Sequence, residues 1–157
     1  MAPRILMSAC LAGLRTRYNG VSSPHPFLGE LTTRAVIIPV CPEILGGLGI
    51  PRAPCRFRGG GGKAVLNGAA QVIDRQGMDR TSAFIRGGEE TLRIVRLVKP
   101  DLIIFKEGSP SCGLRQVDIE AVRQPGCGVT TAIIRLFSLP ILSEEDSFAD
   151  YLPAKKK

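Results

Sequence analysis

The chain has 157 residues, 44% hydrophobic and 22% charged, which is the size and composition of one globular domain with a substantial core. No apolar run approaches the roughly 20 residues of a membrane span, and no secretory signal opens the chain, so we expect a cytoplasmic protein without a membrane partner. The net charge is +7, but with two Tyr and no Trp the chain lacks the aromatic residues of a single-strand nucleic-acid platform. We expect one domain over 1–152 and a basic disordered tail over 153–157.

Two apolar runs in the first 40 residues are typical of strands that are buried on both faces. They span residues 4–9 and 35–40, and a short helix is expected between them over 27–34. Pro39 argues against a central position of the second run in the sheet, because proline has no backbone N–H to donate. A cysteine follows each run directly, Cys10 after the first and Cys41 after the second.

The middle of the chain is rich in Gly, Pro and Arg over residues 44–62, which predicts a surface lid or binding loop. The glycine run 59–62 before Lys63 is no phosphate-binding loop, because Phe57 and Ala64 stand where that motif needs Gly and Ser or Thr. A short strand or hairpin is expected over 64–74, and Asp79 caps a helix that runs to about residue 99.

A third apolar run, over 102–105, leads into the loop that carries Ser109 and Cys112. A helix over 128–137, a strand over 139–142 and a closing helix over 143–151 follow. This order of elements predicts an α/β protein, a single three-layer α/β/α (Rossmann-like) domain with a mainly parallel sheet.

Five cysteines form an odd set in a chain without secretory features, so reduced thiols are expected rather than disulfides. If the three apolar runs are parallel strands of one sheet, Cys10, Cys41 and Cys112 meet at the edge where such sheets bind ligands. Their wide spacing lacks the short Cys-x-x-Cys pattern of a metal site. The residues alone therefore leave two interpretations open, a shared zinc or iron-sulfur site and three unrelated core residues.

Five segments of the chain together resemble one protein family. They are Met7-Ser8-Ala9-Cys10-Leu11, Arg17-Tyr18-Asn19-Gly20, the stretch from Pro39 through Cys41-Pro42-Glu43 to Leu48, Lys106-Glu107-Gly108-Ser109-Pro110-Ser111-Cys112-Gly113, and Gly128-Val129-Thr130-Thr131-Ala132. The set is similar to the domain of unknown function 523 family, which is the thiouracil desulfidase family, from about residue 5 to residue 146. The Cys-Pro-Glu and Ser-Pro-Ser-Cys-Gly blocks are its most specific parts.

The resemblance implies that Cys10, Cys41 and Cys112 hold a [4Fe-4S] cluster with one open iron, and that Glu43 and Ser109 are the catalytic pair. It implies hydrolytic removal of sulfur from a thiolated pyrimidine base or nucleotide, with release of hydrosulfide and no net redox change. The open iron would polarise the C=S carbon, Glu43 would activate water, and Ser109 would hydrogen-bond the substrate or the developing charge. Cys55 and Cys127 are outside the family pattern, so serine at either position should have little effect. Cys127 is expected outside the site, because a fourth ligand would close the open iron.

Candidate substrate contacts are Arg15, Arg17, Asn19, Arg52 and Ser111. Guanidinium groups near the thiols suit a phosphate, so we expect preference for 4-thiouridine 5'-monophosphate, a product of thiolated tRNA turnover, over 4-thiouracil. The family more often has Asp at the position of Asn19. Two alternatives remain, a thiol-based sulfur carrier or oxidoreductase and a basic RNA-binding module, although no stable nucleic-acid complex is expected.

Overall fold

The computed structural model describes residues 1–154, and a four-stranded parallel sheet forms its centre. The strands are β1 (Arg4–Ser8), β2 (Val36–Val40), β5 (Leu102–Phe105) and β8 (Ile141–Ser143), in the order β2-β1-β5-β8. All three pairings are parallel. The three cysteine-bearing runs are therefore parallel strands of one sheet, as the strand pattern requires. Pro39 lies on the edge strand β2, where a missing N–H is tolerated.

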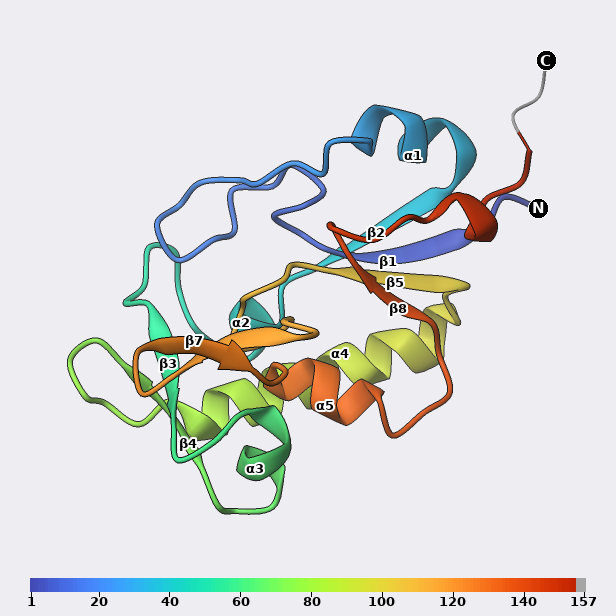
Figure 1. Cartoon of the computed structure of the whole chain (residues 1–157). Helices are drawn as coiled ribbons and strands as arrows, with labels where there is room; N and C mark the ends of the chain where they lie inside the picture. The colour runs from blue at the N-terminus through green and yellow to red at the C-terminus, as the bar shows by residue number, and fades with distance from the viewer. Residues whose placement is uncertain (155–157) are drawn as a thin grey trace.

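Helices cover both faces of this sheet (Figure 1). Helix α1 (Leu28–Arg34) lies on one face, and α4 (Thr81–Val98) and α5 (Val129–Ile134) lie on the other. Alternate residues of β1 face the two layers: Ile5 packs in the cluster that contains Leu31 of α1, and Leu6 packs in the cluster that contains Val95 of α4. The predicted three layers are thus present around this sheet.

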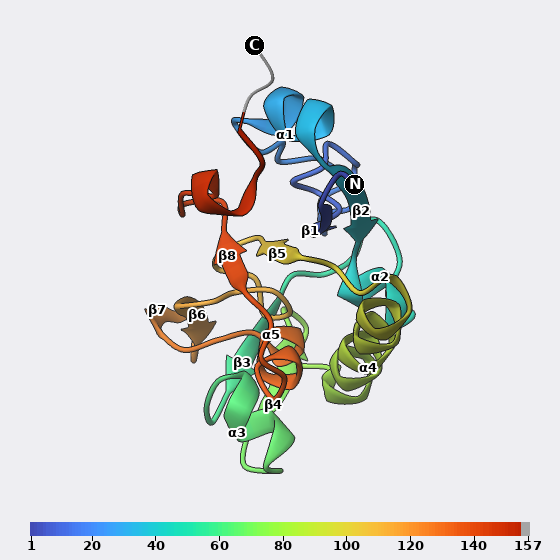
Figure 2. The ribbon, with the colours of Figure 1, turned by 90° about the vertical axis from the view of Figure 1, so that its right-hand side faces the viewer.

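A second, mixed sheet corrects the predicted architecture, which is not clearly a single Rossmann-like domain. It has the order β4-β3-β6-β7, formed by β3 (Cys55–Arg58), β4 (Gln71–Asp74), β6 (Gln116–Ile119) and β7 (Val122–Pro125). Figure 2 shows it beyond the parallel sheet, next to α3 (Gly62–Leu66). The predicted lid over 44–62 therefore contains a strand, in which Phe57 is fully buried in one cluster with Val72 and Val117 of the neighbouring strands.

The predicted closing helix over 143–151 is wrong. Ser143 ends β8, and only a turn of 3-10 helix, Ala149–Tyr151, follows. The Asp146 carboxylate accepts a hydrogen bond from the Ser143 backbone N–H and two from Arg115, which draws this segment back onto the protein. Helix α4 agrees with its prediction to within two residues, whereas α5 is shorter than predicted.

No helix in the described part of the chain combines the length and the apolar character needed to cross a membrane. The predicted basic tail lies outside the described residues from residue 155 onward.

Candidate active site

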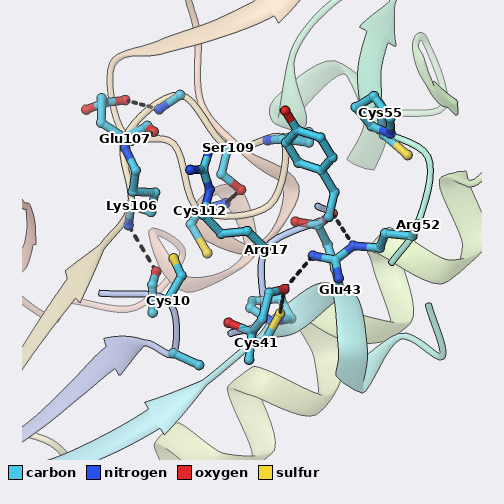
Figure 3. A pocket seen from close by; sticks show the side chains of 18 of the residues that line it. Cys10, Arg17, Cys41, Glu43, Arg52, Cys55, Lys106, Glu107, Ser109 and Cys112 are labelled. Carbon is cyan, nitrogen blue, oxygen red and sulfur yellow. Dashed lines mark hydrogen bonds and ion pairs between the residues drawn. The ribbon is translucent and has the colours of Figure 1, made fainter. Parts of the chain in front are cut away.

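A cavity of about 330 Å³ lies where β1, β2 and β5 end, and the second sheet closes its far side. Cys10, Cys41 and Cys112 all line it, and Figure 3 shows their three sulfur atoms directed into a common space. The convergence of thiols that the strand pattern predicts is therefore present in the structure. All three are free thiols.

Burial is the main influence on these thiols. It raises the pKa of Cys10, of Cys41 and, most strongly, of Cys112 above the ordinary thiol value. The nearby Cys41 raises the pKa of Cys10 further, whereas a hydrogen bond with the Ser8 hydroxyl lowers that of Cys112. The thiols are therefore protonated at neutral pH, and a metal that binds them releases protons.

The loop that carries Cys112 is held by the start of α5. The N–H groups of Val129 and Thr130 donate to the carbonyl oxygens of Pro110 and Ser111 at 2.8 and 3.0 Å. The Thr131 hydroxyl donates to the Cys112 carbonyl at 2.9 Å. The five-residue segment 128–132 thus has a structural task, because it fixes the direction from which Cys112 enters the cavity.

A buried carboxylate holds the same loop from its other side. Glu107 Oε1 accepts hydrogen bonds from four backbone N–H groups, those of Gly108, Leu114, Arg115 and Gln116, at 2.9–3.2 Å. Burial by itself would raise the pKa of Glu107, but the hydrogen bonds outweigh it and the net pKa is lowered. Glu107 therefore closes the loop as an ionised carboxylate.

Glu107→Gln is expected to destabilise the protein by about 1–3 kcal/mol at neutral pH, because the charged acceptor of four N–H groups is lost. A lowered pKa stabilises the fold at pH values above the unfolded pKa of about 4.3, and this contribution disappears as pH falls through the folded pKa. The difference in free energy of unfolding between wild type and variant should therefore shrink below about pH 4. Urea unfolding across pH measures it, with the exposed Glu90→Gln as control, and a pH-independent difference contradicts this role for the charge.

Helix α2 (Pro42–Leu45) places Glu43 beside Cys41, with Pro42 at the start of the helix. The helix packs against α4 through two glycines: a Cβ at Gly46 or at Gly87 would collide with the backbone of the other helix. Glu43 points into the cavity region, where its Oε1 pairs with Arg52 Nε at 3.2 Å. The position of Glu43 thus depends on the close packing of α2 against α4 and on the ion pair of its side chain with Arg52.

Ser109 lies on the opposite wall of the cavity from α2 (Figure 3). Its Oγ accepts hydrogen bonds from the N–H groups of Ser111 and Cys112, each at 3.1 Å. Because both contacts use the oxygen as acceptor, the hydroxyl hydrogen is free to be donated into the cavity. Ser109 is thus a hydrogen-bond donor held at a fixed place next to the thiols.

Four cations line the cavity, and three of them have carboxylate partners. Arg52 pairs with Glu43, Lys106 pairs with Glu144 at 2.6 Å, and Arg123 pairs with Asp118 at 2.9 Å. No carboxylate within residues 1–154 pairs with the fourth, Arg17, whose guanidinium lies 5.9 Å from the centroid of the Tyr18 ring. In Figure 3 its side chain extends across the cavity.

The structure divides the predicted substrate residues into two groups. Arg17 and Arg52 line the cavity. Arg15 and Asn19 are exposed and not among its wall residues, and the Asn19 side chain accepts from the Val21 N–H instead. Ser111 is 1% exposed and also lies outside the wall, because its carbonyl is bonded to the start of α5 and its side chain is packed in the interior.

The two remaining cysteines occupy different places. Cys55 lines the cavity from β3, but in Figure 3 its sulfur points away from the three converging thiols. Burial, with Glu43 and Asp74 nearby, raises its pKa to about 12, so it stays a thiol. Cys127 lines a separate cavity with Lys63, Arg115 and Arg135.

Four wall residues were not among the predicted site residues, namely Tyr18, Lys106, Asp118 and Arg123. Tyr18 and Lys106 lie in segments that carry the family resemblance, which was a signal for them. Asp118 and Arg123 face each other across the β6–β7 hairpin, whose turn residues Glu120 and Ala121 both have positive φ. Polar–apolar alternation in residues 116–119 was a signal for the first strand of this hairpin, but nothing in the sequence places the hairpin at the mouth of the cavity.

Comparison with known proteins agrees with this geometry. Residues 5–146 match the family model described as 2-thiouracil desulfurase. The uncharacterized protein YbbK of Bacillus subtilis (strain 168) is 34% identical over 145 residues, which cover 90% of this chain and 96% of that protein. A solved structure described as [4Fe-4S]-dependent thiouracil desulfidase TudS superposes with a TM-score of 0.76 at 33% identity and covers 91% of each chain. The chain therefore belongs to the 2-thiouracil desulfurase family.

Proposed function

We propose that this protein is a [4Fe-4S]-dependent desulfidase that converts thiolated pyrimidines and water into the uracil product and hydrosulfide. The observation that carries the proposal is the convergence of Cys10, Cys41 and Cys112 on one cavity whose walls also present Glu43 and Ser109. The similarity to a solved [4Fe-4S]-dependent thiouracil desulfidase supports it.

The three thiols suit a cluster better than a single ion. Within the described residues, no group of three or more His, Cys, Asp or Glu side chains could hold one metal ion. A cubane cluster, in contrast, takes each thiolate on a different iron, so its ligands stand farther apart. Soft sulfur ligands also select iron-sulfur clusters over hard cations. Cys10, Cys41 and Cys112 would hold such a cluster, and with three protein ligands one of its irons would be left for the substrate.

When bound, such a cluster supplies a Lewis acid that polarises the carbon–sulfur bond of the substrate. Glu43 accepts a proton from the water molecule that attacks the carbon bearing the sulfur. Ser109 donates its free hydroxyl hydrogen to the substrate where charge develops. Water provides the new oxygen, the C–S bond breaks with its electron pair, and the sulfur leaves as hydrosulfide, so no oxidant or reductant is needed.

Anaerobic reconstitution with iron and sulfide tests the proposal. We expect bound iron and inorganic sulfide, and release of uracil and hydrosulfide in equal amounts from 4-thiouracil. Turnover by protein free of iron would instead favour a thiol-based enzyme, although the raised thiol pKa values argue against that class. Loaded protein that leaves thiolated bases and nucleotides unchanged would overturn the proposal.

We further propose that the preferred substrate is the nucleoside monophosphate and that Arg17 binds its phosphate, since Arg17 is the cavity cation without a carboxylate partner within residues 1–154. Arg17→Gln should raise KM for 4-thiouridine 5'-monophosphate by about 10- to 100-fold and leave KM for 4-thiouracil unchanged. The phosphate is remote from the reacting carbon, so kcat should change little.

Steady-state kinetics with base, nucleoside and monophosphate measure this effect, and Arg15→Gln, on the same loop but outside the cavity wall, is the matched control. Equal kcat/KM values for the three substrates in the wild type would refute a phosphate site. A loss in Arg17→Gln that is the same for the free base would assign Arg17 to the pyrimidine instead.

A further inference from the structure

We propose that Arg52, predicted from the sequence as a substrate contact, is a positioning residue that acts through Glu43. The inference rests on the proposed function in one respect, the role of Glu43 as general base. It assigns to Arg52 the task of holding the Glu43 carboxylate in the orientation in which it accepts a proton.

The hydrogen bonds of Arg52 direct each nitrogen of its guanidinium toward an acceptor within the protein. Nε donates to Glu43 Oε1 at 3.2 Å, Nη2 donates to the Thr16 carbonyl at 3.0 Å, and Nη1 donates to the Gly49 carbonyl at 3.2 Å. Each of the three nitrogens therefore has a partner within the protein. Three of the five N–H groups of the guanidinium are thus used within the protein, which suits a support for Glu43 better than a phosphate site.

The two carbonyl contacts fix the direction in which Nε points. Thr16 lies in the loop after Cys10, and Gly49 lies in the loop after α2, so the guanidinium is held from two separate segments. The Arg52 backbone N–H donates a further hydrogen bond, to the Tyr18 carbonyl at 2.8 Å. A planar group that is held at both ends is a rigid support for the carboxylate it contacts.

Low exposure makes this ion pair different from an ordinary surface pair. The Arg52 and Glu43 side chains are 8% and 15% exposed, whereas Arg93 and Glu90 on α4 are 74% and 42% exposed and 3.6 Å apart. Exposed pairs contribute little, because water screens them and the side chains move freely. Glu43 also sits on a helix of four residues, which offers few further constraints on its side chain.

A double-mutant cycle on kcat tests the inference, with Arg52→Met, Glu43→Gln and the combined variant in the reconstituted enzyme. Methionine keeps much of the volume of arginine and removes its charge and its donors. Arg52→Met should lower kcat about 10- to 100-fold, because a misdirected base is costly, and should leave KM nearly unchanged. In the Glu43→Gln background the same change should cost nothing further, since there is no base left to position.

Iron and sulfide content and the thermal midpoint, measured on each variant, separate positioning from a structural role. We expect cluster content equal to wild type in Arg52→Met. Arg52→Lys should recover only part of kcat, because a lysine cannot make the three contacts. Arg93→Met, which breaks the exposed pair, is the matched control and should leave kcat unchanged.

The outcomes distinguish the inference from the function on which it rests. Additive losses of kcat, or full kcat in Arg52→Met, would overturn the positioning role while Glu43 remains the base. Loss of the cluster in Arg52→Met would show a structural role instead and also overturn it. Full kcat in Glu43→Gln would remove Glu43 as the base and the inference with it, whereas an inactive wild type would remove the proposed function.

Discussion

Serine in place of Cys10, Cys41 or Cys112 is expected to abolish desulfidase activity and to lower bound iron and sulfide in each variant. Serine differs from cysteine by one atom, so the fold should tolerate it. A hydroxyl, however, is a harder and less acidic ligand than a thiol, and it holds iron-sulfur clusters poorly. Iron and sulfide per chain after anaerobic reconstitution, together with the visible absorption of the cluster, measure the loss.

Cys55→Ser and Cys127→Ser are the controls, and both should keep the cluster and turnover. Cys55→Ser is the more stringent control, because Cys55 lines the same cavity as the three proposed ligands. Its sulfur lies 3.6 Å from the Ala53 carbonyl oxygen and is directed away from the cluster space. If Cys55→Ser lost the cluster, Cys55 would be a fourth ligand and no iron would remain open for the substrate.

The meeting of the three thiols could be predicted because it depends on local signals. Each apolar run is short and is followed by a loop, and parallel strands of one sheet end at the same edge. The structure places all three runs in one parallel sheet, in the order β2-β1-β5, which the sequence did not predict. The family motifs at Cys41 and Cys112 pointed to the same cavity.

The second sheet could not be predicted in the same way. Strand β3 has four residues inside a stretch rich in Gly, Pro and Arg, and its partner β6 lies about 60 residues later in the chain. Nothing in the sequence indicates that these two distant segments pair, and the burial of Phe57 and Val117 shows why the strands form. Arg123 reaches the cavity through this sheet, so the prediction of site residues missed it.

The misplaced substrate residues have a related cause. Proximity in sequence to a cysteine does not say in which direction a side chain points. Ser111 is next to Cys112, yet its carbonyl caps α5 and its side chain is buried. Arg52, in contrast, was correctly expected at the cavity, but the carbonyls of Thr16 and Gly49, which occupy its guanidinium, become visible only in the folded chain.

Glu43→Ala is expected to keep the cluster and to lower kcat by about 10²- to 10⁴-fold, the usual contribution of a general base. The carboxylate lies two residues after a proposed ligand, on the wall opposite Ser109, so it faces a substrate held between them. Removal of the side chain leaves the three thiols in place and takes away only the group that accepts the proton from water. Rapid mixing of loaded enzyme with 4-thiouracil, followed by single-turnover analysis, measures the chemical step without product release.

The loss should be confined to kcat for every substrate, because a base that acts on water contributes equally to free base and monophosphate. This pattern is the opposite of that expected for Arg17→Gln, in which KM changes and only for the phosphorylated substrate. Two variants of one cavity would thus separate chemistry from binding. If Glu43→Ala retained full activity with the cluster intact, the ion pair with Arg52 would have only a structural purpose, and the base would have to be sought on the opposite wall, near Ser109.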